Sequence, residues 1–220
     1  MLSFIIKILN WSEVWALIIP LIVLIKKKAK SYYLRPVVTY LWIALILNTF
    51  GDIIDRYADD FKQITLLINN NYLYNIHSIV RFICLSSFFI RLDQPFLVVI
   101  KKRLPFLFLI FVVINFQFEK FFGAETISNR LYAVEAGILL FYCLQYYLYK
   151  LKEDDVTQKH SDFWTTTGLS IYVFFNFFFF LLYNQISPHD QSYGWNFHNI
   201  SYIILCIFIA KAFYVSKFDL

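Results

Sequence analysis

The chain has 220 residues, of which 60% are hydrophobic and 21% aromatic, while only 16% are charged. Soluble domains average about 45–50% apolar and about 25% charged residues, so this composition excludes an ordinary soluble domain and predicts an integral membrane protein. The net charge of +5 does not indicate nucleic-acid binding, because the basic residues lie between hydrophobic segments, where they set membrane orientation.

Seven hydrophobic segments follow one another along the chain, each close to the length that a helix needs to cross a bilayer. They cover residues 8–25, 36–50, 72–90, 104–118, 130–149, 163–183 and 195–214. The strands of a membrane barrel would give weaker, alternating segments of about 10 residues. The sequence therefore predicts an all-α, polytopic membrane protein with seven transmembrane helices, formed as a single domain over residues 1–220.

Basic residues concentrate in alternate connections, and this pattern sets the expected orientation. The first, third and fifth connections and the C-terminal tail carry Lys26, Lys27, Lys28, Lys30, Arg35, Arg91, Lys101, Lys102, Arg103, Lys150, Lys152, Lys159, Lys211 and Lys217. The second connection is acidic, and the sixth has no Lys or Arg. Because basic loops stay in the cytoplasm, we expect the N-terminus outside and the C-terminus in the cytoplasm.

Two of the segments open with the same polar pattern, Asn-x-His, and this similarity extends to other positions. The matched pairs, at offsets of 121 or 122 residues, are Asn75 with Asn196, His77 with His198, Glu13 with Glu135 and Trp42 with Trp164. They predict a 3+1+3 plan with two parallel repeats related by an axis along the membrane normal. The first repeat covers residues about 8–92, a linker helix covers about 104–118, and the second repeat covers about 130–214.

Polar side chains within the segments identify a candidate site. A charge at the centre of a membrane helix costs about 2.5–3.5 kcal/mol on insertion scales, so such groups usually face the bundle interior. His77 and Arg81 are spaced i, i+4 and share a helix face, and Glu135 can pair with Arg81. We expect a pocket for a small polar ligand in the outer half of the bilayer, without metal or cofactor. Its residues are Asn75, His77, Arg81, Glu135, Asn176, Asn196, His198, Asn199 and Tyr202.

Other interpretations of the same residues stay open. Asn, His and Ser also stabilise membrane bundles by interhelical hydrogen bonds without any ligand. A zinc-dependent membrane hydrolase needs three or more ligands, which His77, His198 and Glu135 can supply in principle, but neither HxxxH nor HExxH occurs. Ser78 beside His77 does not indicate a serine hydrolase, because no GxSxG occurs.

The second half of the chain resembles an uncharacterised family of small seven-helix membrane proteins from the Bacteroidetes lineage. The residues that carry the resemblance are Phe163, Trp164, Gly168, Asn176, Glu135, His198, Asn199 and His77. The chain departs from the family pattern where a Glu is expected soon after His77, since Arg81 and Phe82 occupy that region. The resemblance implies a seven-helix fold in a bacterial cytoplasmic membrane but no established activity.

The 3+1+3 plan also resembles that of SWEET-type sugar transporters and KDEL receptors. Paired Asn residues on the third and seventh helices suit a sugar site, but the hinge prolines of those transporters are missing, and only Pro20 lies well inside a predicted helix. Fold analogy alone does not assign function.

Two functions follow as hypotheses. The first is a non-enzymatic sensor that passes a conformational change to a membrane or cytoplasmic signalling partner, since no output domain is visible in the chain. The second is a small facilitative transporter or receptor for a polar solute. Partners expected from the sequence are the lipid bilayer, the signalling protein and the polar ligand, and nucleic acid is not among them.

Overall fold

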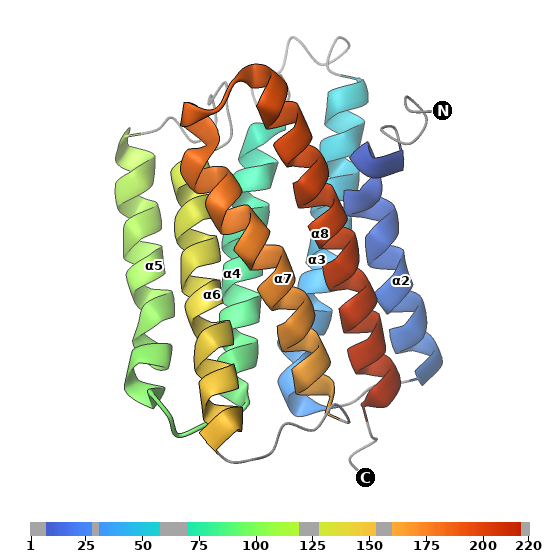
Figure 1. The fold of residues 1–220 in the computed structure, drawn as a ribbon. Coiled ribbons are helices and arrows are strands. Elements are labelled where there is room, and N and C mark those ends of the chain that lie inside the picture. The colour runs from blue at the N-terminus through green and yellow to red at the C-terminus, as the bar shows by residue number, and fades with distance from the viewer. Residues whose placement is uncertain (1–7, 28–30, 58–69, 119–127, 153–159, 217–220) are drawn as a thin grey trace.

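The computed structural model describes residues 8–27, 31–57, 70–118, 128–152 and 160–216. Within these ranges the protein is all-helical, and its helices run alternately up and down in one bundle (Figure 1). The elements, in chain order, are α2 (Ser12–Lys27), η1 (Tyr32–Leu34), α3 (Arg35–Arg56), α4 (Asn71–Arg91), α5 (Val98–Phe118), α6 (Asn129–Lys152), α7 (Ser161–Leu182), η3 (Tyr183–Gln185) and α8 (Pro188–Val215). The prediction of an all-α fold is confirmed.

Within the part of the chain that the structure describes, five helices are long and apolar enough to cross a membrane. These candidate spans are Tyr32–Arg56, Asn71–Arg91, Asn129–Lys152, Ser161–Gln185 and His189–Val215. Their length matches the roughly 20 residues that span a hydrocarbon core. The helices that correspond to the first and fourth predicted segments, α2 and α5, do not meet this criterion over the described residues.

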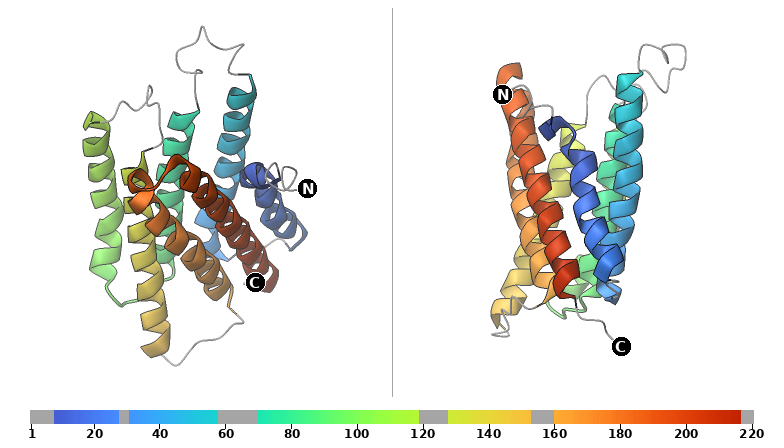
Figure 2. Two further views of the ribbon diagram at one scale, coloured as in Figure 1. Left: turned by 45° about the horizontal axis from the view of Figure 1, so that its top comes forward. Right: turned by 90° about the vertical axis from the view of Figure 1, so that its right-hand side faces the viewer.

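Six helices form a closed ring, and α5 lies outside it. Around the ring, α2 packs on α3, α3 on α4, α4 on α6, α6 on α7, α7 on α8, and α8 again on α2. The side view in Figure 2 shows α2 between α8 and α3, which closes the ring. Helix α5 contacts α4 and α6, where the Phe108 ring lies 3.8 Å from the Phe82 ring.

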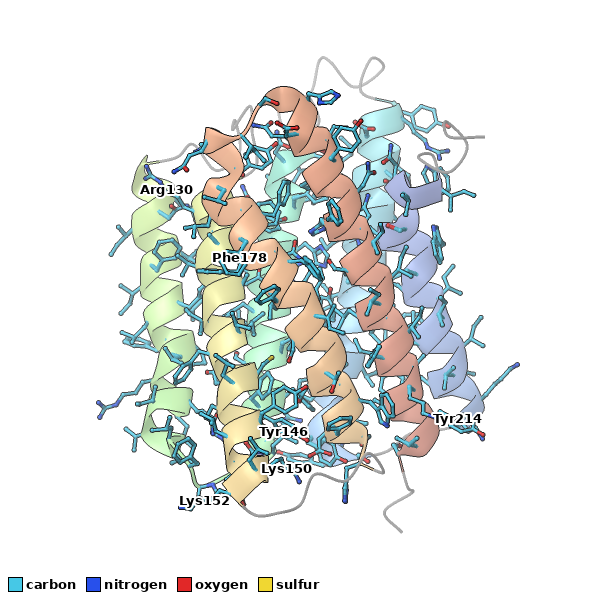
Figure 3. All side chains as sticks on the ribbon, in the orientation of Figure 1. Arg130, Tyr146, Lys150, Lys152, Phe178 and Tyr214 are labelled. Atoms are coloured by element: carbon cyan, nitrogen blue, oxygen red, sulfur yellow. The ribbon has the colours of Figure 1, made fainter. Side chains whose placement is uncertain are left out.

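The outer surface of the bundle is largely apolar, as a lipid-facing surface should be. On α5 the exposed side chains include Phe106, Leu107, Ile110 and Val113. Phe178 on α7 points outward in the same way (Figure 3) and is 46% exposed. Contiguous apolar surface of this extent is uncommon on soluble monomers, and it agrees with the membrane character of the five long helices.

Charge is divided between the two ends of the bundle. Lys150 and Lys152 lie at the lower end in Figure 3, and Arg130 lies at the upper end. The lower helix ends also carry Lys26, Lys27, Arg35, Arg91, Lys102, Arg103 and Lys211 together with Asp162, whereas the upper ends carry the acids Glu13, Asp52, Asp55 and Asp190 together with Arg56. The alternation of basic and acidic connections therefore produces one basic end and one acidic end.

Several predicted boundaries were wrong because hydropathy locates only the apolar part of a helix. Helix α8 begins seven residues before the predicted position 195, since Ser187 caps it by accepting a hydrogen bond from the Asp190 N–H at 3.2 Å and Pro188 suits the first turn. Helix α3 continues to Arg56 and includes Asp52, expected in a connection. Helix α5 begins at Val98, so Pro105 also lies inside a helix, contrary to the expectation that only Pro20 does.

Candidate functional site

An ion pair joins α4 to α6 at the centre of the bundle. The Arg81 Nε donates to Glu135 Oε1 at 2.5 Å, and its Nη2 donates to Oε2 at 2.7 Å. The two side chains are only 4% and 1% exposed, and a buried charge is tolerated when it is paired and hydrogen-bonded in this bidentate way. The pairing expected from the sequence is therefore present, and it neutralises both charges.

The groups around the ion pair complete its hydrogen bonding. Ser78 Oγ donates to Glu135 Oε2, and Arg81 Nη1 donates to the Tyr172 hydroxyl, each at 2.5 Å. The Arg81 guanidinium also lies 5.1 Å from the Tyr172 ring centre, within the range of a cation–π contact. Side chains of α4, α6 and α7 thus form one buried hydrogen-bonded network around the Arg81–Glu135 pair.

A second polar cluster lies where α8 meets α2 and α7. His198 Nδ1 contacts Asn176 Oδ1, and His198 Nε2 lies 3.2 Å from Glu13 Oε1. Helix α3 supports this cluster through Asn48, whose amide donates to the Glu13 carbonyl oxygen at 2.8 Å. The Trp195 ring stacks on the imidazole at 4.9 Å, so His198 is enclosed on several sides.

Three fully buried tyrosines connect the two clusters. The Tyr40 hydroxyl donates to the Tyr202 hydroxyl at 3.3 Å, and the Tyr172 ring lies 5.7 Å from both the Tyr202 ring and the His198 ring. The Tyr40 ring also stacks on His77, with ring centres 5.8 Å apart and planes inclined by 10°. Aromatic contacts of this kind contribute beyond the area they bury.

Some buried polar atoms near this centre lack hydrogen-bond partners among the described residues. They are the Nε2 of His77 and both amide atoms of Asn199, in residues that are only 3% and 1% exposed. Buried polar groups are nearly always hydrogen-bonded, so each exception requires an explanation. His77 stacks on Tyr40, and Asn199 precedes Tyr202 by three residues on the same face of α8, so both belong to the tyrosine-lined centre.

The structure separates two of the predicted site residues from this centre. Asn75 is buried, but its Oδ1 accepts from the Ser128 N–H at 3.3 Å at the start of α6. Two residues on a helix differ by about 200° in direction, so Asn75 and His77 cannot share one face. Asn196 is half-buried and, like Asn75, lies two positions before the histidine of its helix.

Besides Ser78 and Trp195, four participating residues were not among the predicted set. They are Glu13, Tyr40, Asn48 and Tyr172. Glu13 could have been identified from the sequence, because the repeat offset aligns it with Glu135. Tyr40 and Asn48 could not, since only the packing of α3 determines which of its polar residues face inward.

Metal ligands and surface hollows are the other features of the described residues that bear on a functional site. The described residues contain no group of three or more His, Cys, Asp or Glu that could hold a metal ion. Two surface hollows of about 360 and 570 Å³ lie at the bundle ends. Pro95, Phe96, Tyr149 and Lys152 line the first, and Ile8, Trp11, Trp15 and Arg56 line the second, so neither hollow involves the central polar residues.

The fold and the site together define an all-helical bundle with membrane-compatible helices and a buried polar network at its centre. The chain matches no family model, no curated protein and no solved structure.

The substitution Tyr40→Phe removes one buried hydroxyl while keeping the ring that stacks on His77. We expect a loss of about 1 kcal/mol of stability, the usual net value of a hydrogen bond, because the Tyr202 hydroxyl loses its partner on α3. Thermal unfolding of the purified protein in detergent measures this loss. Tyr193→Phe is the matched control, since Tyr193 is 56% exposed, and an equal effect of both substitutions would contradict the role of the Tyr40 hydroxyl.

Proposed function

We propose that the protein is a seven-span protein of a bacterial cytoplasmic membrane, with its N-terminus outside and its C-terminus in the cytoplasm. The five long apolar helices supply five spans, and α2 and α5 supply the other two. The exposed apolar side chains of α5 support its contact with lipid. The division of charge supports the orientation, because the basic end of the bundle belongs in the cytoplasm.

The 3+1+3 duplication is part of this proposal, and the ring of helices supports it. A half-turn of the ring would place α2 on α6, α3 on α7 and α4 on α8, with α5 as the linker outside. The acid of each first helix then reaches the partner half in an equivalent way. Glu135 contacts Arg81 and Ser78 on α4, and Glu13 contacts His198 on α8.

The function best supported is that of a ligand sensor without enzymatic activity, acting through a signalling partner. The observation that carries it is the set of buried links between the first half (α2, α3, α4) and the second half (α6, α7, α8). Arg81–Glu135, Glu13–His198 and Tyr40–Tyr202 all cross between the halves. A ligand that competes for such links favours a different arrangement of the halves, which is how binding shifts a conformational equilibrium.

The ligand would be small, polar and uncharged. Arg81 and Glu135 already neutralise each other, and His198 lies against Glu13, so the network offers no free charge to an ionic ligand. In the central network, His77 Nε2 and the Asn199 amide lack hydrogen-bond partners among the described residues, and together they can both donate and accept hydrogen bonds. A hydroxyl- or amide-bearing molecule complements them.

Isolation of the protein from its native membranes in mild detergent tests the signalling role. A sensor is expected to retain a signalling protein in fixed stoichiometry, with contacts that cross-linking maps to the basic end of the bundle. Absence of any protein partner over a range of detergents would count against this function.

A facilitative transporter is the alternative, and the ring of two related halves favours it, because such halves rock around a central site in alternating access. Flux of labelled neutral polar solutes into liposomes containing only this protein distinguishes the two functions. A transporter shows flux that falls on Asn199→Leu, whereas a sensor shows binding without flux.

A further inference from the structure

His198 lies between an amide and a carboxylate, and this arrangement determines where its protons are. Its Nδ1 faces the Oδ1 of Asn176, and its Nε2 lies 3.2 Å from the Oε1 of Glu13. The imidazole is 4% exposed and the Glu13 side chain 11% exposed. Which ring nitrogen carries a proton has to be inferred from the surrounding hydrogen bonds.

The orientation of the Asn176 amide is fixed by its other partners. Its Nδ2 donates to the Tyr172 backbone carbonyl at 2.6 Å, and a carbonyl oxygen only accepts. The same Nδ2 lies 3.4 Å from Ser201 Oγ. Ser201 Oγ donates its own hydrogen to the His198 backbone carbonyl at 2.8 Å, so it accepts from Nδ2. The amide oxygen of Asn176 therefore faces His198, and Nδ1 of His198 must carry a proton to donate to it.

A second proton must then lie between His198 and Glu13. With Nδ1 protonated, a neutral imidazole offers a lone pair at Nε2, and an ionised carboxylate facing it would place two acceptors 3.2 Å apart. One proton resolves this conflict, either on the carboxyl group or on Nε2. Both forms leave the pair with no net charge, which suits its burial.

Charged and titratable groups on the neighbouring helices surround this pair. Asp52 on α3 interacts electrostatically with Glu13. The other titratable groups that interact with the pair are Tyr74 and His77 on α4, Tyr132 on α6, Tyr172 on α7 and Tyr202 on α8. Of the cations on these helices, Arg81 on α4 is paired with Glu135, and Arg56 on α3 lies over the Trp11 ring at 4.0 Å and interacts with Asp52.

Glu13 also gives the pair a route to water. It lies in the first turn of α2, at the upper end of the bundle in Figure 1, and it is the more exposed member of the pair. A proton can therefore be exchanged with solvent on the acidic side of the molecule, without crossing the apolar core.

We propose that Glu13 and His198 form a binding site for a single proton, and that loss of this proton releases α2 from α8. Deprotonation leaves an anionic carboxylate against the Nε2 lone pair, so the contact that holds these two helices becomes repulsive. The α2–α8 contact is then present while the proton is bound and is lost as the pH rises past the point of its release. The site requires neither the ligand nor the partner proposed above.

The position of the proton is measured by ¹⁵N NMR of histidine-labelled protein in lipid nanodiscs, from about pH 5 to about pH 9. We expect His198 Nδ1 to stay protonated throughout, and Nε2 to change from a shared-proton signal to an unprotonated one as the pH rises. In Glu13→Gln the amide donates to Nε2 and has no proton to lose, so Nε2 stays unprotonated over the range. An unprotonated Nδ1 in the wild type, or an identical titration in Glu13→Gln, would overturn the proposal.

The consequence for the helices is measured by spin-label distances. Labels at Ile18→Cys on α2 and Ile207→Cys on α8 occupy exposed positions, in a background where Cys84, Cys143 and Cys206 are replaced by alanine. The distance is expected to increase with pH in the otherwise unaltered protein and to stay constant when Glu13→Gln is added. His189→Ala, which removes an exposed imidazole, should leave the pH response intact. A wild-type distance that does not change when Nε2 loses its proton would refute the release of α2.

Discussion

Replacing Glu135 with alanine is expected to prevent the protein from accumulating in a folded form. The substitution leaves the Arg81 guanidinium buried, 4% exposed, without the carboxylate that receives two of its hydrogen bonds. Breaking a buried ion pair by removing one partner typically costs about 3–5 kcal/mol, a large fraction of the roughly 5–15 kcal/mol that stabilises a native domain. Size-exclusion chromatography and thermal unfolding of the purified protein measure the loss.

The double substitution Arg81→Met with Glu135→Leu is the informative control. Replacing both members of a buried pair by apolar residues of similar volume is often neutral or stabilising, so the double variant should recover most of the stability that Glu135→Ala loses. If the double variant is as unstable as the single one, the cost would arise from packing at α4–α6 and not from the unpaired charge.

The substitution Gly168→Ala is expected to push α7 away from α8. A Cβ atom at this position would lie 2.5 Å from the Cβ of Phe208 and 3.4 Å from the Leu205 Cα. These atoms are fixed to the α8 backbone, so no side-chain rotation relieves the clash, and overpacking of this kind costs about 1–3 kcal/mol. The better helix propensity of alanine returns up to about 1 kcal/mol, which leaves a net loss visible as a lower Tm.

Gly137→Ala is the matched control for this close approach. Its added Cβ would lie 3.2 Å from the edge of the Phe177 ring, which can turn aside, so its Tm should stay the same or rise slightly. Phe208→Ala retains the obstructing Cβ and should not rescue Gly168→Ala, whereas Phe208→Gly should. Equal Tm shifts for the two glycine variants would contradict a backbone-limited contact between α7 and α8.

The helices could be predicted from the sequence because membrane-compatible segments are strongly apolar, and each predicted segment coincides with a helix. The ends were harder to predict, since a helix continues into its polar flank wherever a cap such as Ser187 satisfies its first N–H groups.

The candidate site was predictable to the extent that charge limits the choices. Arg81 and Glu135 are charged residues inside an apolar bundle, where an unpaired charge is costly, and they form an ion pair with each other. Neutral residues such as Tyr40 and Asn75 are less constrained, because either an inward or an interfacial position satisfies them. Their roles depend on the rotation of each helix, and the packing of the whole ring determines that rotation.

Native mass spectrometry of the protein, isolated from its own membranes in lipid nanodiscs, tests whether a polar molecule is bound at the centre of the bundle. His77 Nε2 and the Asn199 amide lack hydrogen-bond partners among the described residues, and they are the groups expected to bind a small uncharged molecule between the two halves of the bundle. The wild-type protein is expected to carry such a molecule, and Asn199→Leu, which removes both amide atoms, should lack it while eluting as a folded protein. A wild-type protein without any bound polar molecule, or with one that Asn199→Leu retains in equal amount, would contradict a ligand site at His77 and Asn199.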